Sequence, residues 1–220
     1  MTIKAIIWDF GGVFTSSPFD GFRAFEQARG LPRDFLRGVN ATNPHENAWA
    51  QFERAEIGAE AFDSAFAEES AALGYRVRGA EVLSLLCCDI RPAMVAALKA
   101  CKGRYKLGCI TNNVPSGFAP GMSDDAEVAA AIADIFAQFD HVTESSKVGL
   151  RKPEPRIYQL MCDALQIAPR SCVYLDDLGV NCKQAAALGM IAIKVQTGEQ
   201  ALADLSRTLG HELGRTTITA

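Results

Sequence analysis

Five short apolar runs are spaced along the chain and separated by longer stretches with helical periodicity. The first run, Ala5–Trp8, is apolar at every position, which is typical of a strand buried on both faces in the middle of a parallel sheet. Four further strands are expected at residues 105–110, 139–143, 171–175 and 190–195. Strands that alternate with helices at this spacing predict an α/β fold built on a doubly wound parallel sheet.

Helices are predicted where apolar residues recur three and four positions apart. In the second half of the chain this pattern covers 91–102, 124–137, 153–165, 181–188 and 200–209. Pro92 and Pro153 near the first turns of two of these helices, and Gly189 just after a third, are typical helix boundaries. No element is assigned to the tail at 216–220.

Residues 16–89 follow a different pattern. They show helical periodicity only, at 20–29, 33–38, 45–57 and 60–73, and no alternating run typical of a strand. A segment of about seventy residues is marginal as an independent domain but large enough to cover a cleft. We therefore expect a helical cap at 16–89, inserted into a core made of residues 1–15 and 90–220. The aromatic residues of this cap are expected mainly to pack its helices, with one or two facing the cleft: Phe22, Phe25, Trp49, Phe52, Phe62 and Phe66.

Composition limits the possible partners. The 220 residues are 49% hydrophobic and 22% charged, which predicts a large core. A formal net charge of -4 and a sequence pI near 5.4 argue against nucleic acid, because binding a polyanion needs a concentrated basic surface. No apolar run approaches the roughly 18 residues of a membrane span, and no basic leader precedes a long apolar segment. We therefore expect no membrane contact and a cytoplasmic location.

The seven cysteines include the adjacent pair Cys87 and Cys88, and none shows the two-residue separation of a zinc ribbon. They are expected to be reduced thiols of the core. The histidines His45, His141 and His211 are scattered and have no nearby Ser or Cys in a catalytic arrangement, so surface positions or satisfied hydrogen bonds are expected for them.

Polar residues directly follow three of the expected strands. In an open parallel sheet the carboxyl ends of the strands form the ligand-binding edge, so these residues should lie close together: Asp9, Thr111 with Asn112, and Asp176 with Asp177. An unpaired carboxylate is costly to bury, so Asp9 should face a cleft that contains a cation. Gly11 and Gly12 allow a tight turn close to a ligand. Taken alone, Asp9 is equally compatible with an ordinary strand-to-loop residue that caps a helix.

Lys152 lies in a stiff segment between the third and fourth expected strands. Prolines on both sides of Glu154 restrict the segment and would direct Lys152 toward the same edge; a solvated loop lysine is the alternative. A carboxylate nucleophile, a hydroxyl with backbone amides, a lysine and a carboxylate pair are what phosphoryl transfer through an aspartyl-phosphate requires. Carboxylates from two strand ends also make a hard oxygen site suited to Mg²⁺, which would screen the repulsion between Asp9 and an anionic substrate.

In this order, the motifs resemble those of the haloacid dehalogenase-like (HAD) hydrolase superfamily, in the subfamily with a helical cap after the first strand. The stretches VGLRKPEPRIYQ and VYLDDLGVNCKQAAALGM are similar to the N-terminal phosphatase domain of soluble epoxide hydrolase and to the N-terminal domain of an acyl-CoA dehydrogenase family member. The resemblance implies a HAD-like Rossmannoid core. It also implies these roles: Asp9 as nucleophile and metal ligand, Gly11 through its carbonyl and Asp177 as further ligands of Mg²⁺, Thr111 and Asn112 as holders of the phosphoryl oxygens, Lys152 as the lysine that steadies the phosphoryl group and Asp9, and Asp176 and Asn181 as supports.

The chain departs from the phosphatase pattern at Gly11, where most phosphatases of this superfamily carry a second Asp as general acid and base. Such assistance is typically worth about 10² to 10⁴-fold in rate. The resemblance therefore implies a Mg²⁺-dependent phosphatase that favours good leaving groups, with a small anionic substrate such as an aryl phosphate ester or an acyl phosphate. The residues do not identify the physiological substrate, and they leave the oligomeric state open, including a homodimer. Arg23, Arg33 and Arg37 of the cap could attract such a substrate, although solvated faces are commoner.

Two other functions remain open. The dehalogenase branch also lacks an acid at this position and uses its Asp to displace halide without metal, but it is not expected to keep a tandem pair such as Asp176 and Asp177. A binding or regulatory protein whose chemistry has decayed at Gly11 is the other, and the joint presence of Asp9, Lys152 and Asp177 argues against it.

Overall fold

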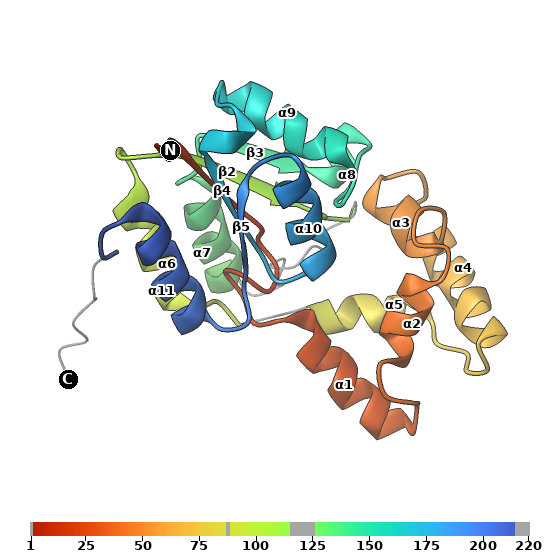
Figure 1. Ribbon diagram of the computed structural model, residues 1–220. Coiled ribbons are helices and arrows are strands. Elements are labelled where there is room, and N and C mark those ends of the chain that lie inside the picture. Colours follow the sequence, from red (N-terminus) through yellow and green to blue (C-terminus); the bar gives the residue numbers. More distant parts are fainter. Residues whose placement is uncertain (1, 87–88, 115–125, 214–220) are drawn as a thin grey trace, which may run out of the picture.

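The computed structural model describes residues 2–86, 89–114 and 126–213. Within these ranges five parallel strands form one sheet in the order β3-β2-β1-β4-β5 (Figure 1), so the predicted α/β fold with a parallel sheet is confirmed. The strands are β1 (Ala5–Trp8), β2 (Lys106–Thr111), β3 (His141–Glu144), β4 (Cys172–Asp176) and β5 (Ile191–Lys194). The central strand β1 is fully buried and pairs on both sides, with Trp8 opposite Cys109 on β2 and Leu175 on β4.

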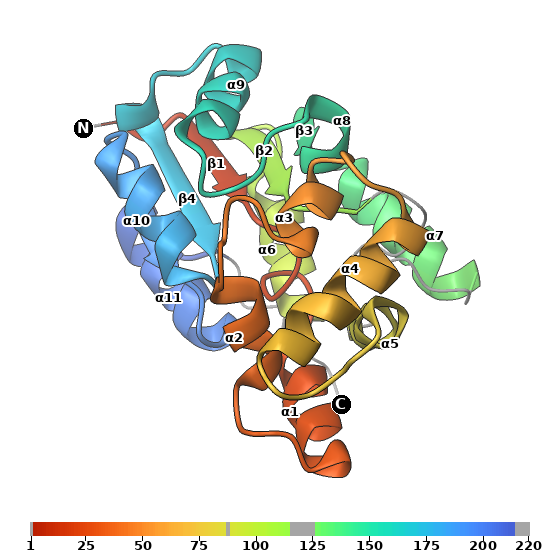
Figure 2. The ribbon, with the colours of Figure 1, turned by 90° about the vertical axis from the view of Figure 1, so that its right-hand side faces the viewer.

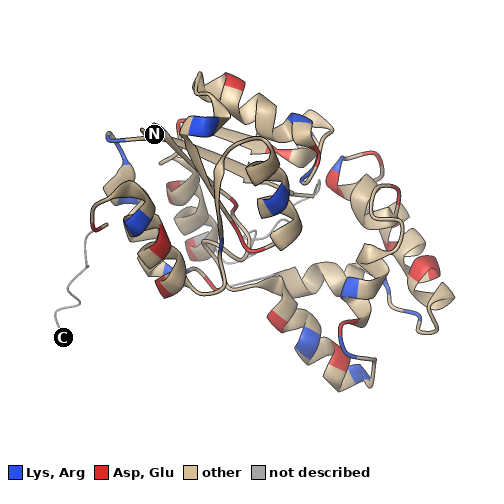
Figure 3. Cartoon of the chain, viewed as in Figure 1, with Lys and Arg blue, Asp and Glu red and all other residues tan. Residues whose placement is uncertain are grey.

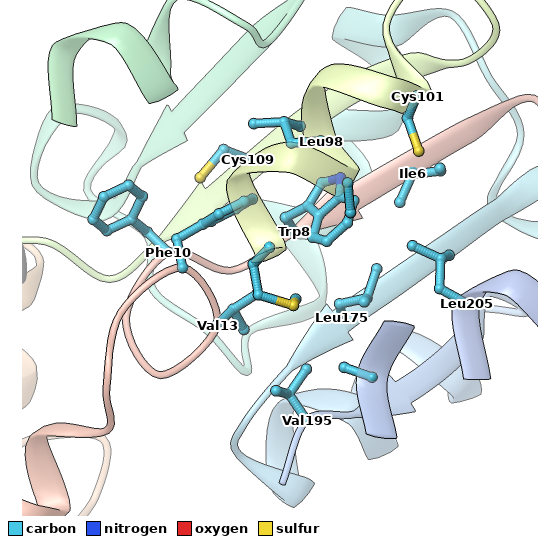
Figure 4. Packing of buried hydrophobic residues seen from close by; sticks show 14 of the residues in the cluster. Ile6, Trp8, Phe10, Val13, Leu98, Cys101, Cys109, Leu175, Val195 and Leu205 are labelled. Atoms are coloured by element: carbon cyan, nitrogen blue, oxygen red, sulfur yellow. The ribbon is translucent and has the colours of Figure 1, made fainter. Parts of the chain in front are cut away.

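Helices cover both faces of the sheet. Successive β1 side chains point to opposite faces, so they pack against different sets of helices. Ile6 and Trp8 pack with α6 (Pro92–Cys101), α7 (Ala126–Phe136) and α11 (Gly198–Leu209), and Figure 4 shows Trp8 in this cluster near Leu98 and Leu175. Ala5 and Ile7 pack with α9 (Pro155–Leu165) and α10 (Gly179–Ala187) on the other face. A single turn, α8 (Ser145–Val148), follows β3, and a short 3-10 turn, η2 (Pro169–Ser171), precedes β4.

Residues 18–86 form a group of helices with its own apolar cluster, which we call the helical segment. Figure 2 views the molecule from the side of the helical segment and shows α2, α3 and α4 in front of the core. Phe52 on α3 stacks on Phe62 of α4 with ring centroids 4.6 Å apart. The elements are α1 (Pro18–Arg29), α2 (Phe35–Ala41), α3 (Ala48–Glu53), α4 (Ala59–Ala72), α5 (Gly79–Leu83) and the 3-10 turn η1 (Ser84–Leu86).

The chain leaves the core for the helical segment and returns to it at neighbouring points. Thr15 and Ile90 form an isolated antiparallel bridge, and the backbone amide of Arg91 donates to the carbonyl of Phe14 at 2.7 Å. The two crossings therefore lie together just beyond the turn that follows β1. This placement puts the helical segment next to the carboxyl end of the central strand.

The expected helix at 45–57 is wrong in its bounds, since only Ala48–Glu53 is helical. The side chain of Asn47 caps this helix by accepting from the amide of Ala50, and Ala55 adopts a positive φ of 58° that ends the turn. Helix α2 also runs three residues beyond the expected 33–38, and neither α5 nor the single turn α8 was predicted. The other strands and helices lie within about two residues of their expected bounds, as is usual at element ends.

Several expectations fall outside the described residues: the Cys87–Cys88 pair, most of the loop after β2, the helix start at 124–125 and the tail at 216–220. The five described cysteines are buried and free, as expected for core thiols: Cys101, Cys109, Cys162, Cys172 and Cys182. Among the described helices, none combines the length and apolar character needed to cross a bilayer. In Figure 3 the positions of acidic and basic residues are interspersed along the helices.

Candidate active site

Asp9 is the first residue beyond β1, and its carboxylate is nearly buried, with 7% of the residue exposed. Its backbone amide continues the sheet by donating to the carbonyl of Leu175 at 2.8 Å. One carboxylate oxygen, Oδ1, accepts from the amide of Phe10 at 2.7 Å and lies 2.6 Å from Nζ of Lys152. The cation that sequence reasoning requires beside Asp9 is therefore a lysine of this chain.

Lys152 is buried between two carboxylates. Its Nζ lies 2.9 Å from Oδ2 of Asp176 and 2.6 Å from Asp9, and only 1% of its side chain is exposed. The backbone of Lys152 is held at both ends by Asn112, whose Oδ1 accepts from the lysine amide at 2.8 Å and whose Nδ2 donates to the lysine carbonyl at 3.1 Å. Ordering such a long side chain is entropically costly, so the two carboxylates must offset that loss.

Asp176 has no exposed surface and is surrounded by donors. It accepts from the amide of Leu178 at 2.8 Å, from Nδ2 of Asn181 at 3.0 and 3.1 Å, from the Tyr174 hydroxyl and from Lys152. A buried carboxylate with this many donors is held in one orientation. Asp176 therefore fixes Lys152 from behind, and Asn181 fixes Asp176.

Asp177 is only partly buried and lies against the turn after β1. Ser17 Oγ donates to its Oδ2 at 3.3 Å. Gly12 has a positive φ of 69°, and a Cβ added there would come within 2.3 Å of Asp177 Oδ2. Both the backbone conformation and this close approach require glycine. The turn carrying Gly11 and Gly12 is thus fitted closely around the Asp177 carboxylate.

Three carboxylates face one another with a single ammonium among them, because oxygens of Asp9, Asp176 and Asp177 all lie within 4.8 Å of one another. Burial raises the pKa of Asp9 well above its usual value, and the other two carboxylates add to this against the opposing effect of Lys152. Burial and the Asp176 charge raise the pKa of Asp177 to about 6. Burial opposes the charged form of Lys152, but Asp176 and Asp9 outweigh it and raise its pKa.

The site therefore carries an excess of negative charge that a divalent cation would offset. Its exposed ligand atoms are carboxylate oxygens, which suit Mg²⁺ better than a soft metal. Asp9 and Asp177 are the carboxylates with oxygens left over, since Asp176 is committed to its donors. The residues present thus fit a magnesium ion.

Thr111 is the last residue of β2 and Asn112 follows it, and both line the same cavity as Asp9. Within the described part of the chain the hydroxyl of Thr111 has no hydrogen-bond partner, so it is available to a ligand. The amide side chain of Asn112 is instead occupied, because it bonds the Lys152 backbone and donates to Glu53 Oε2 at 3.0 Å. This leaves the backbone amide of Asn112 as its group for an anion.

A cavity of about 500 Å³ separates this rim from the helical segment. Of the cap aromatics considered in the sequence, Phe22 and Trp49 line it, which agrees with the expectation that one or two face the cleft. Of the candidate arginines Arg23, Arg33 and Arg37, Arg37 is among the described residues that line the cavity. Its guanidinium lies over the ring of Phe19, 4.6 Å from the ring centroid. Most of the wall away from the rim is apolar, formed by Phe19, Phe22, Ala41, Pro44, Trp49, Leu86, Val114, Leu178 and Val180.

The histidines differ in their surroundings. His45 is exposed, as expected, but it also lines the cavity, which its sequence context did not indicate. His211 lies just after α11, and its Nε2 is 2.8 Å from the Tyr105 hydroxyl. His141 is exposed on β3. Neither of these two lines the cavity within the described ranges.

Sequence reasoning missed three residues of the site: Glu53, Arg151 and Tyr174. Tyr174 had a signal, because it stands two residues before Asp176 on β4 and therefore on the same face of the strand. Glu53 and Arg151 had none, since their ion pair joins two elements 98 residues apart. Nε of Arg151 lies 2.6 Å from Oε2 of Glu53.

Known proteins match most of this chain in sequence. A family model described as haloacid dehalogenase-like hydrolase matches residues 3–189. Bifunctional epoxide hydrolase 2 of Mus musculus is 30% identical over 228 residues, covering 96% of this chain but 40% of that protein. Acyl-CoA dehydrogenase family member 10 of the same organism is 31% identical over 96% of this chain and 19% of its own length. The chain thus spans less than half of these two relatives.

Two further proteins match over nearly their whole length. Phosphatase MT3486 of Mycobacterium tuberculosis (strain CDC 1551 / Oshkosh) is 31% identical over 235 residues, covering 94% of this chain and 95% of that protein. The HAD family enzyme bt-2542 of Bacteroides thetaiotaomicron, crystallised with magnesium and inorganic phosphate, superposes with a TM-score of 0.56 at 17% identity and covers 89% of this chain and 96% of its own. At that identity the superposition supports the fold alone.

Proposed function

The chain belongs to the haloacid dehalogenase-like hydrolase family, and on that basis we propose that it is a Mg²⁺-dependent phosphatase that works through an aspartyl-phosphate on Asp9. The observation that carries this proposal is the buried pair of Asp9 and Lys152, 2.6 Å apart, at the edge of a cavity with Asp177 beside it. The phosphatase relative MT3486 supports the reaction class, and the three carboxylates grouped around Asp9 support the metal.

In the proposed reaction the Asp9 carboxylate attacks the phosphorus of a bound phosphate ester. The phosphorus–oxygen bond to the leaving group breaks, and its electron pair leaves with that oxygen. Water then attacks the phosphorus of the aspartyl-phosphate, gives up its proton to solvent, and releases inorganic phosphate with Asp9 restored. Lys152 keeps its positive charge throughout and holds Asp9 in place for both steps.

Other residues of the rim take the proposed supporting parts. The Thr111 hydroxyl and the Asn112 backbone amide would bind the phosphoryl oxygens. Asp9, Asp177 and the carbonyl of Gly11 would hold Mg²⁺, which supplies positive charge against the phosphoryl group and the nucleophile when bound. Asp176 and Asn181 would hold Lys152 in place from behind, as their hydrogen bonds indicate.

The substrate is proposed to be a small phosphate ester or acyl phosphate with a good leaving group. Gly11 lines the cavity where a general acid would be needed. Besides Asp9 and Asp177, the acidic residue among the described lining residues is Glu53, which is held by Arg151 and Asn112. A leaving group that needs little protonation, such as an aryl or acyl group, avoids this deficit. The apolar wall of the cavity also suits an aryl group.

The helical segment is proposed to be a cap. In this division residues 16–89 cover the site, and residues 1–15 and 90–220 form the catalytic core. Support comes from the cavity, whose wall combines strand-end residues of the core with Phe22, Arg37 and Trp49 of the helical segment. A cap of this kind would exclude water and select the substrate's organic part.

A substrate panel tests the proposal. Purified protein is assayed with aryl phosphates, acyl phosphates, alkyl phosphates and 2-haloacids, each with Mg²⁺ and with chelator. Turnover of aryl and acyl phosphates only with Mg²⁺, abolished in Asp9→Asn and retained in the surface control Asp134→Asn, is the expected result. Mass spectrometry of the quenched reaction should detect the phosphoryl group on Asp9.

Two outcomes would replace the proposal. Halide release from 2-haloacids in chelator would assign the chain to the dehalogenase branch. A folded protein that binds Mg²⁺ and phosphate but never carries a phosphoryl group would instead be a binding or regulatory protein.

A further inference from the structure

Glu53 connects the helical segment to the loops that carry the active-site residues. It is the last residue of α3 and is 6% exposed. Oε1 accepts from the indole Nε1 of Trp49 at 2.8 Å, which fixes the side chain on its own helix. Oε2 faces the core, where it accepts from Nε of Arg151 at 2.6 Å and from Nδ2 of Asn112 at 3.0 Å.

The two partners of Oε2 are chain neighbours of residues in the proposed reaction. Arg151 immediately precedes Lys152, and Asn112 immediately follows Thr111. Asn112 also clamps the Lys152 backbone at both its amide and its carbonyl. Movement of the Glu53 carboxylate would therefore displace Arg151 and Asn112, and with them the backbone segment that positions Lys152 beside Asp9.

Arg151 fastens the helical segment at a second point. Its Nη1 donates to the carbonyl of Pro44 at 2.9 Å, in the loop between α2 and α3. Side chains of both members of the Glu53–Arg151 ion pair are largely covered, at 8% and 14% exposure, and both residues line the cavity. The pair, together with Asn112, therefore bridges the boundary between helical segment and core at the cavity wall.

A covered ion pair at such a boundary is poorly explained by stability. Removing two charges from water offsets much of their attraction, so a covered pair often contributes little net stabilisation compared with apolar packing. Its geometry nevertheless specifies one arrangement of the groups it joins. Here that arrangement is a closed cavity with Lys152 in place.

Building on the proposed phosphatase activity, we propose that Glu53 is a positioning residue, which acts through Arg151 and Asn112 to link closure of the helical segment to the placement of Lys152 beside Asp9. Glu53 takes no part in the bond changes. It holds the lysine-bearing segment in register with the nucleophile when the cavity is closed.

Kinetics of Glu53→Gln provide the first test. With an aryl phosphate and Mg²⁺, kcat per folded protein is expected to fall by about 10²-fold, the loss that a misplacement near 1 Å can cause, while KM changes little. Glu56→Gln is the matched control, because it removes an ion pair between the half-exposed Glu56 and Arg54 in the same segment, and neither residue lines the cavity. That control should retain wild-type kcat. A Glu53→Gln enzyme with wild-type kcat overturns the proposal.

A double-variant comparison tests whether Glu53 acts through Arg151. Arg151→Gln should lower kcat to a similar extent, and the Glu53→Gln/Arg151→Gln enzyme should be no slower than the worse single variant, since both changes break one connection. Losses that multiply in the double variant would show two independent effects and would reject the linkage. Denaturation in urea establishes the folded fraction of each variant.

Trp49 reports closure without any turnover. Trp8 is fully buried and its Nε1 has no partner among the described residues, so Trp8→Phe leaves Trp49 as the only indole. In this background Glu53→Gln, and also Arg151→Gln, which removes no contact of the Trp49 indole, should expose Trp49 to acrylamide and shift its emission to the red, whereas Glu56→Gln should not. If Trp8→Phe does not fold, wild-type quenching serves instead, because the buried Trp8 is shielded. Unchanged quenching in Glu53→Gln would refute closure by this residue.

The two proposals fail separately. A wild-type protein that turns over no phosphate compound rejects the proposed function, whatever Glu53 does to Trp49. Wild-type turnover that Glu53→Gln leaves intact rejects the positioning role and preserves the phosphatase.

Discussion

Gly11 stands two residues after the proposed nucleophile and lines the cavity. Unlike Gly12, its backbone does not adopt a positive φ, so a side chain at this position meets no conformational penalty. The residue therefore limits the reaction by lacking a proton donor rather than by shaping the turn. This separates two adjacent glycines: Gly12 is required by its φ and by the approach of Asp177, whereas Gly11 has no positive φ that would require glycine.

Gly11→Asp should broaden the substrate range. An acid here would protonate poor leaving groups, so turnover of alkyl phosphates is expected to rise by at least about 10-fold, within the range that general acid catalysis supplies, with aryl phosphates much less affected. The ratio of the two kcat/KM values measures this. Gly11→Asn is the matched control, since it adds the same volume without the proton. An equal gain from Asn, or none from Asp in a folded protein, would contradict the acid deficit.

Single residues were predictable where the backbone itself determines their position. Asp9, Thr111 and Asp176 follow or end parallel strands, and parallel strands bring their carboxyl ends to one edge, so the sequence alone placed them together. Lys152 was expected at this edge because the prolines on both sides of Glu154 stiffen its segment. The use of the Asn112 side chain was not readable, since its partners include Glu53 of a distant helix. Side-chain contacts between elements depend on packing that no local pattern encodes.

At the scale of elements, β2 and α9 meet at a glycine. A Cβ on Gly108 would lie 2.5 Å from Sδ of Met161 and 3.2 Å from Cδ1 of Leu165 on α9. The helix packs this closely on the sheet only because β2 carries no side chain there. The glycine thus sets the distance between the sheet and the helix that begins just after Lys152.

Gly108→Ala should therefore destabilise the protein by about 1–3 kcal/mol, the usual cost of overpacking a core. Urea unfolding monitored by circular dichroism measures it. Gly38→Ala is the control, because Gly38 is an exposed residue inside α2 with open space around its Cβ position. That change should stabilise the protein by about 0.5–1 kcal/mol, since alanine favours helix. Similar effects of the two changes would rule out close packing at Gly108.

The sequence predicted core elements better than those of the helical segment. Strand β1 is continuously apolar because both of its faces are covered, and helix α9 begins at Pro155, so each has a strong local signal. Helix α3 has an apolar pattern that continues past its end, and the positive φ of Ala55 that stops it has no glycine to announce it. Elements ended by ordinary residues in unusual conformations are not marked in sequence patterns.

For the whole molecule, the main consequence of the fold is a concentration of negative charge at one rim. Three carboxylates meet there because β1 and β4 are neighbours in the sheet, and Asp9 and Asp177 among them line a cavity that residues of the helical segment also line. The family and the α/β architecture inferred from the motifs are confirmed by the family model and the strand order. Lys152 neutralises part of the charge and leaves the remainder for a cation. In the absence of that cation, the site should lower the stability of the folded protein.

Asp177 offers a test of this balance across pH. Its pKa in the folded protein is raised from 3.8 to about 6, chiefly by burial and by Asp176. Because the folded state then binds more protons than the unfolded state between these values, stability contributed by this group falls as pH rises from about 4 to 6. The loss is complete above the folded pKa and amounts to about 2–3 kcal/mol, since one pKa unit corresponds to roughly 1.4 kcal/mol and partial exposure reduces the effect.

Asp177→Asn should accordingly stabilise the metal-free protein at pH 7.5 by about 2 kcal/mol, and this gain should vanish near pH 4, where Asp177 is protonated in both states. Urea unfolding in chelator at the two pH values measures it, with Asp134→Asn as the surface control. Addition of Mg²⁺ at pH 7.5 should then stabilise the wild type, by mass action on the folded state, and leave Asp177→Asn nearly unchanged. A variant that is less stable than wild type in chelator at pH 7.5 would mean that Asp177 is held by favourable contacts, and the rim would then have no excess charge for a cation to offset.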